Sequence, residues 1–199
     1  MTHIALFSSG NGTNAENIAN YFNKNSQIKV AVIVSNKQNA FVHQRAKALS
    51  IPSYTFSKNE IMEGTKLLKL LSDYNIDYII LAGFLLKIPD ILLKSFPNRI
   101  INIHPALLPK YGGKGMYGDN VHKKVVEMGD KQSGITIHYV NEKYDEGEII
   151  FQESCNVSPN DTYNDVAQKV HKLEYAYFPR IIEEVILGKK KNSLRKRYI

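Results

Sequence analysis

The chain has 199 residues, a net charge of +7 and a single cysteine, Cys155. One cysteine excludes an intrachain disulfide and a zinc site built from thiolates. No apolar stretch approaches the ~20 residues of a membrane-spanning helix, and no basic, apolar leader opens the sequence. We therefore expect a cytoplasmic protein with no membrane partner.

Strands and helices alternate through the first half of the sequence. Apolar runs predict strands at 3–9, 28–35, 52–56, 77–84 and 99–103. Apolar residues at helical spacing predict helices at 14–25, 40–49, 60–75 and 88–96. The second half predicts a helix at 121–129, strands at 134–140 and 148–157, and a long final helix from about 162 to 187.

Three sequence signals predict where helices begin. Thr13 with Glu16, and Ser57 with Glu60, have the spacing of a capping box, in which each side chain bonds the other residue's backbone N–H. Asp161 is the expected N-cap of the final helix.

The alternation predicts an α/β fold, a single doubly wound domain over 1–199 with a mostly parallel, Rossmann-like sheet. No helix separates the last two strands, so we expect them to form an antiparallel edge, with the long C-terminal helix after them. Ligands of such folds bind beyond the carboxyl ends of the parallel strands. The sequence places two polar segments there, SSGNGTN after the first strand and HPALLP after the strand at 99–103.

Much of the positive charge lies in the last twelve residues, GKKKNSLRKRYI. We interpret 188–199 as a solvated, partly flexible basic tail. Aromatic and basic residues do not interleave there as they do in an RNA-binding platform, so we expect no nucleic-acid partner. Binding of a small anionic substrate is the other explanation of the positive net charge.

The glycine loop SSGNGTNAE has three interpretations. Gly10, Gly12 and Ala15 match the loose dinucleotide fingerprint, but the second strand ends in SNK, without the acid that holds a ribose. Backbone N–H groups of Gly12, Thr13 and Asn14 could instead bind a phosphate at a helix N-terminus. Taken alone, the loop slightly favours the third interpretation, an ordinary tight turn with a capped helix.

Asn102 and His104 interrupt an apolar strand, which Pro105 ends. Residues i and i+2 of a strand point to one face, so the amide and the imidazole lie side by side at the strand's carboxyl end. A core polar pair and a metal site are the alternatives, but an amide is a poor partner for imidazole around zinc. The amide suits a carbonyl oxygen that gains negative charge, and Asp145 is the candidate carboxylate for an acid–base step. We favour acyl transfer without a side-chain nucleophile and without a metal.

Five segments in order carry a family resemblance: SSGNGTN, AGF, NIHPALLPKY, GITIHYVNEKYDEGEII and EYAYFP. Together they resemble the folate-dependent formyltransferases over nearly the whole chain, and the glycine loop resembles the branch that formylates phosphoribosylglycinamide in purine biosynthesis. The resemblance implies 10-formyltetrahydrofolate as co-substrate, small-molecule substrates only, and a monomer or homodimer. Other folate formyltransferases or a formyltetrahydrofolate hydrolase are the alternative.

The resemblance also implies roles for individual residues. Asn102 would hold the formyl oxygen, His104 would act as the acid, and Asp145 would keep His104 protonated. The phosphoribosyl substrate would contact Gly12, Thr13, Asn14, His171 and Glu174. The pterin would contact Asn102 and two loops, formed by Leu85, Leu86, Lys87 and Ile88, and by Asn141, Glu142, Lys143, Tyr144 and Asp145.

The chain also departs from the family pattern. It has Leu-Leu-Lys-Ile after AGF where many members have Met-Arg-Ile-Leu, and His171 where some have Gln. The segment at 111–124 is longer and richer in glycine than in several relatives, either as a mobile lid over the folate or as an insertion. Methionyl-tRNA formyltransferase and formyltetrahydrofolate deformylase carry extra domains that we do not expect here, and a non-catalytic nucleotide-binding protein would leave Asn102, His104 and Asp145 unexplained.

Overall fold

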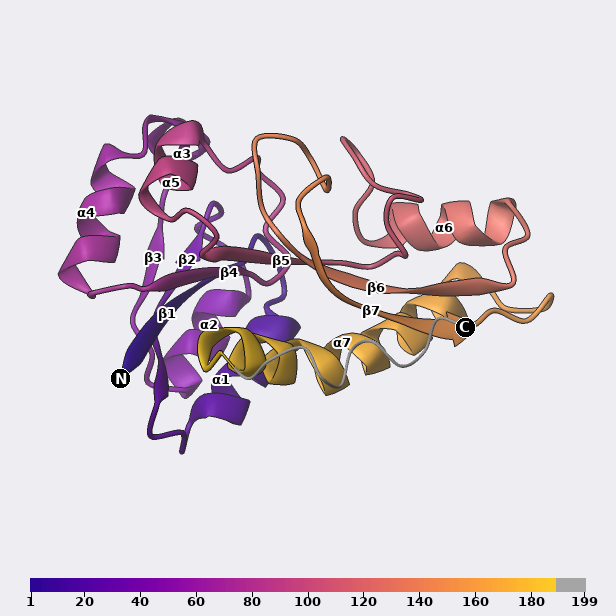
Figure 1. Ribbon diagram of the computed structural model, residues 1–199, viewed down its shortest axis with the longest axis horizontal. Helices are drawn as coiled ribbons and strands as arrows, with labels where there is room; N and C mark the ends of the chain where they lie inside the picture. Colours follow the sequence, from indigo (N-terminus) through magenta and orange to yellow (C-terminus); the bar gives the residue numbers. More distant parts are fainter. Residues whose placement is uncertain (189–199) are drawn as a thin grey trace.

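The computed structural model describes residues 1–188, which form a seven-stranded sheet in the order β3-β2-β1-β4-β5-β6-β7 (Figure 1). The strands are Thr2–Phe7 (β1), Ile28–Ser35 (β2), Ser53–Thr55 (β3), Tyr78–Leu81 (β4), Ile100–His104 (β5), Gln132–Tyr139 (β6) and Ile149–Asn156 (β7). The tail predicted at 188–199 lies outside the described residues except for Gly188.

The strand pairing confirms a mostly parallel sheet with an antiparallel edge. β1 pairs in parallel with β2 and β4, β2 with β3, and β4 with β5. β6 then pairs antiparallel with both β5 and β7. The strand order reverses between β1 and β4, which in doubly wound folds opens a crevice at the carboxyl ends of the strands.

Helices cover both faces of the sheet. Their bounds are Thr13–Phe22 (α1), Val42–Ala48 (α2), Lys58–Glu63 (α3), Thr65–Asp73 (α4), Asp90–Ser95 (α5), Asp119–Glu127 (α6) and Tyr163–Ile186 (α7). α7 runs along the same side of the sheet as α1, and α3, α4 and α5 lie on the opposite side (Figure 1). The long C-terminal helix predicted from the sequence is confirmed.

Two apolar cores separate along the two faces. One contains β-strand residues together with Ile18 of α1, Val125 of α6 and Phe178 of α7. The other contains Phe7 with Ile61 of α3 and Leu67 of α4. Strands buried on both faces explain why β1, β2 and β4 are continuous apolar runs rather than alternating ones.

The helix predicted at 60–75 is two helices. Gly64 takes a left-handed conformation with φ of 79°, which ends α3 and serves as the N-cap of α4. The Ser57–Glu60 capping box at the start of α3 is confirmed. Helical spacing continues across Gly64, so the apolar pattern alone did not reveal the break.

Two predicted caps are wrong. Gly12, not Thr13, is the N-cap of α1 and has no side-chain cap bond; Glu16 instead forms an ion pair with Arg45 of α2. Thr162, not Asp161, caps α7, in a capping box with Asp165.

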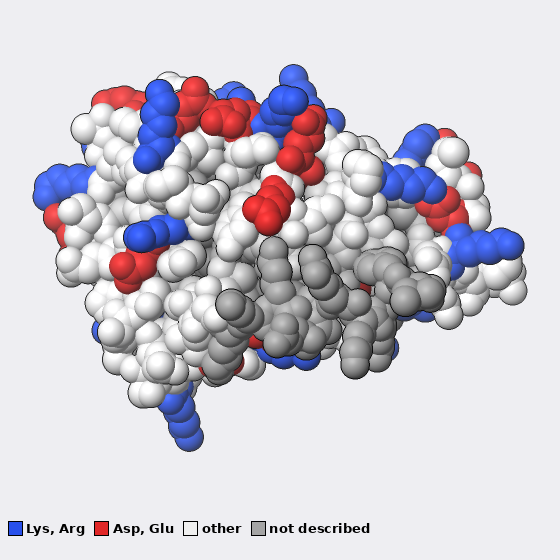
Figure 2. Space-filling view, viewed as in Figure 1, with Lys and Arg blue, Asp and Glu red and all other residues white. Residues whose placement is uncertain are grey.

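Figure 2 shows lysines and arginines interspersed with acidic residues on the face in view, without a continuous basic stripe. Within residues 1–188 no helix is both long and apolar enough to cross a membrane.

Candidate active site

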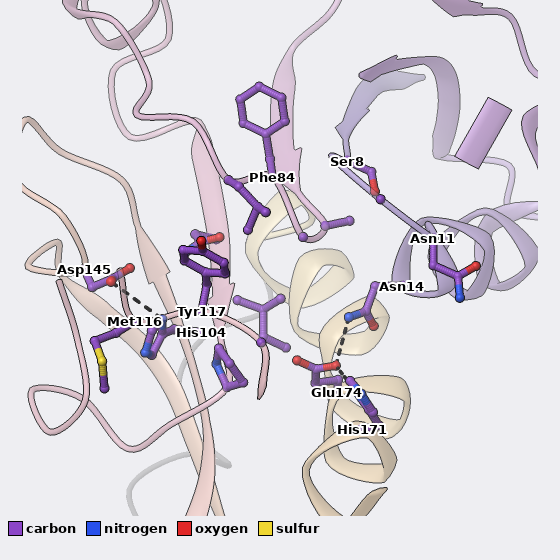
Figure 3. Close-up of a pocket in the computed structure, with 18 of the residues that line it drawn as sticks. Ser8, Asn11, Asn14, Phe84, His104, Met116, Tyr117, Asp145, His171 and Glu174 are labelled. Atoms are coloured by element: carbon purple, nitrogen blue, oxygen red, sulfur yellow. Dashed lines mark hydrogen bonds and ion pairs between the residues drawn. The ribbon is translucent and has the colours of Figure 1, made fainter. Parts of the chain in front are cut away.

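A cavity of about 600 Å³ opens beyond the carboxyl ends of β1, β4 and β5. Parallel strands end there together, so residues far apart in the sequence share one pocket. Of the predicted site residues, its lining includes Gly12, Thr13, Asn14, Leu85, Asn102, His104, Tyr144, Asp145, His171 and Glu174. Two clusters face each other across it, His104 with Asp145, and Asn14 with His171 and Glu174 (Figure 3).

His104 is the last residue of β5 and is 4% exposed. Its Nε2 lies 2.7 Å from the carbonyl oxygen of Tyr111. A carbonyl only accepts, so Nε2 carries the proton in this contact. Nδ1 is then the nitrogen that takes up a further proton, and it faces Oδ2 of Asp145 at 3.6 Å. The bond to the Tyr111 carbonyl thus orients the His104 ring so that its basic nitrogen, Nδ1, faces the Asp145 carboxylate.

Both groups that face His104 come from residues with unusual backbone conformations. Tyr111 has φ of 58° and Asp145 has φ of 56°, a left-handed region that few residues other than glycine adopt. Such conformations persist only where the surrounding structure stabilises them, and they concentrate at functional sites. Here they direct the Tyr111 carbonyl and the Asp145 carboxylate toward the same imidazole.

The loop that carries Asp145 folds closely onto β6. A Cβ on Gly147 would lie 1.7 Å from the carbonyl oxygen of Tyr139, so only glycine fits at this approach. The backbone N–H of Gly113 donates to Asp145 Oδ2 at 2.9 Å. Glycine two residues after Asp145 therefore lets the loop approach the strand closely enough to place the carboxylate in the pocket.

The pKa of Asp145 lies below its ordinary value. Burial raises this pKa, but the facing His138 imidazole, the charge of His104 and the Gly113 N–H outweigh burial and lower it. Asp145 is therefore a carboxylate at neutral pH and can accept or attract a proton.

The pKa of His104 also lies below its ordinary value, which corrects the expectation that Asp145 keeps it protonated. Burial lowers this pKa, and the attraction of Asp145 and the bond to Tyr111 only partly oppose it. Desolvation penalises the imidazolium more than one carboxylate at 3.6 Å stabilises it. In the ligand-free protein His104 is neutral at neutral pH, ready to accept a proton.

His138 completes this end of the site, and the sequence interpretation missed it. Antiparallel pairing places His138 of β6 opposite Asn102 of β5. Its Nδ1 lies 2.8 Å from the Tyr139 carbonyl and must carry a proton, which leaves Nε2 as an acceptor in the neutral ring. The Asn102 Nδ2 donates to it at 3.1 Å, so His138 fixes which way the Asn102 amide faces. Asp145 Oδ1 lies 3.7 Å from the same Nε2.

Thr136 stabilises the segment that follows His104. It is fully buried, and its hydroxyl donates to the Ala106 carbonyl at 2.6 Å and accepts from the Leu108 N–H at 2.9 Å. Gln152 of β7 donates to both Thr136 Oγ1 and the Leu108 carbonyl. The turn after β5 is therefore held by the two antiparallel strands.

At the other end of the pocket, Gly12 begins α1 in a left-handed conformation with φ of 76°. A Cβ there would lie 2.4 Å from Val42 Cγ2, so both the backbone conformation and the packing of α2 require glycine. Arg45 donates to the carbonyl of Asn11 at 2.9 Å and to its side chain at 3.0 Å. The first N–H groups of α1 have no acceptor within the helix and lie at the pocket, as anion-binding helix termini do.

Glu174 of α7 lies beside the start of α1 and is 4% exposed. Asn14 donates to Glu174 Oε2 at 2.9 Å, and His171 Nδ1 lies 2.8 Å from the same oxygen. The bond to Glu174 raises the pKa of His171, and burial only partly opposes it. This end of the pocket thus holds a histidine whose charged form is favoured by a neighbouring carboxylate.

A smaller cavity of about 70 Å³ adjoins the pocket through Asn102 and Asp145. Its lining includes the other residues predicted to hold the pterin: Leu86, Lys87, Ile88, Asn141 and Lys143. Glu142 is not among the residues that line it. The two loops predicted to form one subsite therefore do converge on one cavity.

The glycine-rich segment forms a wall of the main pocket through residues 113–118. His122, which follows it in α6, is 1% exposed and also lines the pocket. The sequence interpretation did not assign His122, Ser8, Asn11, Phe84, Met116 or Tyr117, all of which line it. Within residues 1–188, no three histidine, cysteine or acidic side chains are grouped so as to hold a metal ion.

Comparison with known proteins shows the family of this chain. The sequence profile described as formyl transferase matches residues 2–182. The chain is 42% identical over 193 residues to a protein of Arabidopsis thaliana named phosphoribosylglycinamide formyltransferase, chloroplastic; the match covers 92% of this chain and 66% of that protein.

Two bacterial proteins match over most of their length. The phosphoribosylglycinamide formyltransferase of Bacillus subtilis (strain 168) is 35% identical over 191 residues, which is 94% of this chain and 95% of that protein. The crystal structure of glycinamide ribonucleotide transformylase 1 from Symbiobacterium toebii superposes with a TM-score of 0.86 at 30% identity, covering 94% of this chain and 89% of that one.

Proposed function

This chain belongs to the formyl transferase family, and we propose that it transfers the formyl group of 10-formyltetrahydrofolate to the amine of phosphoribosylglycinamide, a step of de novo purine biosynthesis. The observation that carries the proposal is the single pocket that joins two different chemistries. One end holds Asn102, His104 and Asp145, and the other holds a helix N-terminus beside Glu174. The first suits acyl transfer, and the second suits a phosphorylated sugar.

The reaction begins when the amine nitrogen attacks the formyl carbon. A new carbon–nitrogen bond forms, the formyl oxygen becomes an oxyanion and the attacking nitrogen becomes an ammonium. Asn102 donates to the oxyanion through its amide, because His138 accepts one of the two amide hydrogens and leaves the other available.

Proton transfer then decides which bond breaks. His104 is neutral before reaction and has Nδ1 open toward Asp145, so it accepts the ammonium proton there. The resulting imidazolium lies beside the Asp145 carboxylate and is stabilised by it. The imidazolium then gives this proton to the folate nitrogen. The oxyanion re-forms the carbonyl as the bond between that nitrogen and the formyl carbon breaks, which releases tetrahydrofolate and the N-formylated product.

The substrate phosphate would lie at the start of α1, against the N–H groups of Gly12, Thr13 and Asn14. The pterin would occupy the small cavity between the loops at 85–88 and 141–145, which opens at Asn102 and Asp145. This arrangement directs the formyl group from one side and the amine from the other toward the same three residues.

The test is formyl transfer by the purified protein, followed by chromatography of the formylated product with and without phosphoribosylglycinamide. We expect product only with both substrates. Release of formate without the acceptor would show a hydrolase instead. Calorimetric titration with NAD and NADP checks the glycine loop, because the missing acid after β2 predicts no specific binding; tight NAD binding would contradict a phosphate subsite.

A further inference from the structure

One ring nitrogen of His122 is buried in the pocket wall and has no hydrogen-bond partner within residues 1–188. The residue is 1% exposed, and the unpaired nitrogen is Nδ1. A buried polar atom without a partner costs about 1–3 kcal/mol, so such atoms are normally paired. His122 lines the pocket at the end opposite to Asp145, where its ring meets the His171 ring with centroids 6.3 Å apart.

Asn14 has a second unpaired atom in the same region. Its Nδ2 donates to Glu174, but its Oδ1 is buried and has no partner among the described residues. The Glu174 carboxylate adds further acceptor capacity, since both of its described bonds use Oε2. This corner of the pocket therefore presents acceptors from α1 and α7 beside one imidazole nitrogen from α6.

The surroundings of His122 favour its neutral form. Burial lowers its pKa, and the facing His171 lowers it further, while Glu174 and Asp119 act in the opposite direction and His104 lowers it again. Because Glu174 favours the charged form of His171, a charged His122 ring beside it would be repelled. A neutral ring has one donor nitrogen and one acceptor nitrogen.

A hydroxyl group matches this corner better than an anion does. A hydroxyl donates to Asn14 Oδ1 or to the Glu174 carboxylate, and it pairs with His122 Nδ1 in either tautomer. A phosphate dianion has no proton to donate to Asn14 Oδ1 or to the Glu174 carboxylate, and the charge of Glu174 would repel it. Two neighbouring hydroxyls could satisfy the unpaired atoms together.

We propose that His122 is a substrate-binding residue whose Nδ1 bonds a ribose hydroxyl and that, with Asn14 and Glu174, it selects a ribosyl over a deoxyribosyl substrate. This inference rests on the proposed function for the identity of the sugar. It places the ribose between α1, α6 and α7 and leaves the phosphate for the N-terminus of α1.

The variants His122→Leu and His122→Asn test the role. Leucine removes the polar atom, whereas asparagine returns an amide atom to the position of Nδ1. We expect His122→Leu to weaken binding of phosphoribosylglycinamide about tenfold by calorimetry, the loss of about 1.4 kcal/mol, and His122→Asn to restore most of it. Affinity for the formyl-folate should not change. His43→Leu, at a histidine that bonds Ser53 and Thr55 away from the pocket, is the matched control.

A deoxyribosyl analogue gives the decisive comparison. Wild type and His122→Leu should bind an analogue that lacks the contacted hydroxyl equally, so the tenfold difference should vanish with it. Unchanged affinity of His122→Leu for phosphoribosylglycinamide would refute the role. So would an equal loss of affinity for the deoxyribosyl analogue and the ribosyl substrate. If the wild type binds the ribosyl compound selectively but transfers no formyl group, the proposed function is overturned. The ribose subsite at His122 is then still supported.

Discussion

Two histidine–carboxylate pairs lie at opposite ends of one pocket, and their imidazoles have opposite properties. His104 faces Asp145 at 3.6 Å, and its pKa is lowered. His171 bonds Glu174 at 2.8 Å, and its pKa is raised. The side chain of His104 is 5% exposed and that of His171 is 50% exposed, so water can solvate a charged His171 ring but not a charged His104 ring.

This difference shows that a carboxylate beside a histidine does not determine its charge. Burial and contact geometry decide whether attraction outweighs desolvation. The strand-end pair keeps a neutral base that becomes charged as the reaction proceeds, which favours the transition state over the ground state. In the helix pair Glu174 raises the pKa of His171 and favours its charged form without substrate, which suits binding rather than chemistry.

Loss of the Asp145 charge should have the largest effect. Asp145→Asn keeps the size but removes the stabilisation of the His104 imidazolium, so we expect turnover to fall roughly 10²-fold, the scale of a positioned acid–base group. Substrate affinity should change little, and the His104 pKa should fall further. Single-turnover kinetics and an NMR titration of His104 in both proteins measure this. Full turnover, or an unmoved His104 titration, would make Asp145 a structural loop residue.

The matching change at the other end is Glu174→Gln. The amide keeps the side chain's shape but loses the charge that holds His171 protonated, so the His171 pKa should fall. Bonds to charged groups are worth about 1.5–3 kcal/mol, and we expect KM for phosphoribosylglycinamide to rise about tenfold or more with little change in kcat. Steady-state kinetics separate the two constants. A loss confined to kcat would show that both pairs serve the chemical step.

His138 should affect turnover through Asn102. His138→Asn keeps the bond to the Tyr139 carbonyl but removes the acceptor at Nε2, so the Asn102 amide loses its fixed direction. We expect turnover to fall by about tenfold, on the scale of one lost hydrogen bond to an aligned group. His138→Gln places an amide oxygen near the former Nε2 and should lose less. If the two variants are equally slow, His138 acts through packing instead.

The smallest expected effect is on the pH dependence of stability, which should differ in sign between His171 and His104. The raised pKa of His171 adds stability below about pH 6.5, the ordinary histidine value, and this stability is lost as pH rises through the raised pKa. The lowered pKa of His104 has the opposite sign, so stability is lost as pH falls below about 6.5. Urea unfolding of wild type and His171→Gln at pH 6 and pH 8 should show a larger difference at pH 6. An equal difference at both values would mean that His171 is uncharged.

Much of the fold and part of the site follow from local sequence patterns. Apolar runs alternating with helical spacing predicted the doubly wound sheet, and the missing helix between the last strands predicted its antiparallel edge. The i, i+2 spacing of Asn102 and His104 before Pro105 predicted a polar pair at a strand end. These features depend on residues close in sequence, whose geometry is set by the backbone period.

Contacts between distant residues were decided only by the tertiary structure. Strand register placed His138 opposite Asn102, 36 residues away. Helix packing brought Glu174 to Asn14, 160 residues away, and took Glu16 from its expected cap to Arg45. The charge of His104 also depended on burial, which no local pattern specifies, because desolvation is a property of everything packed around a group rather than of its neighbours along the chain.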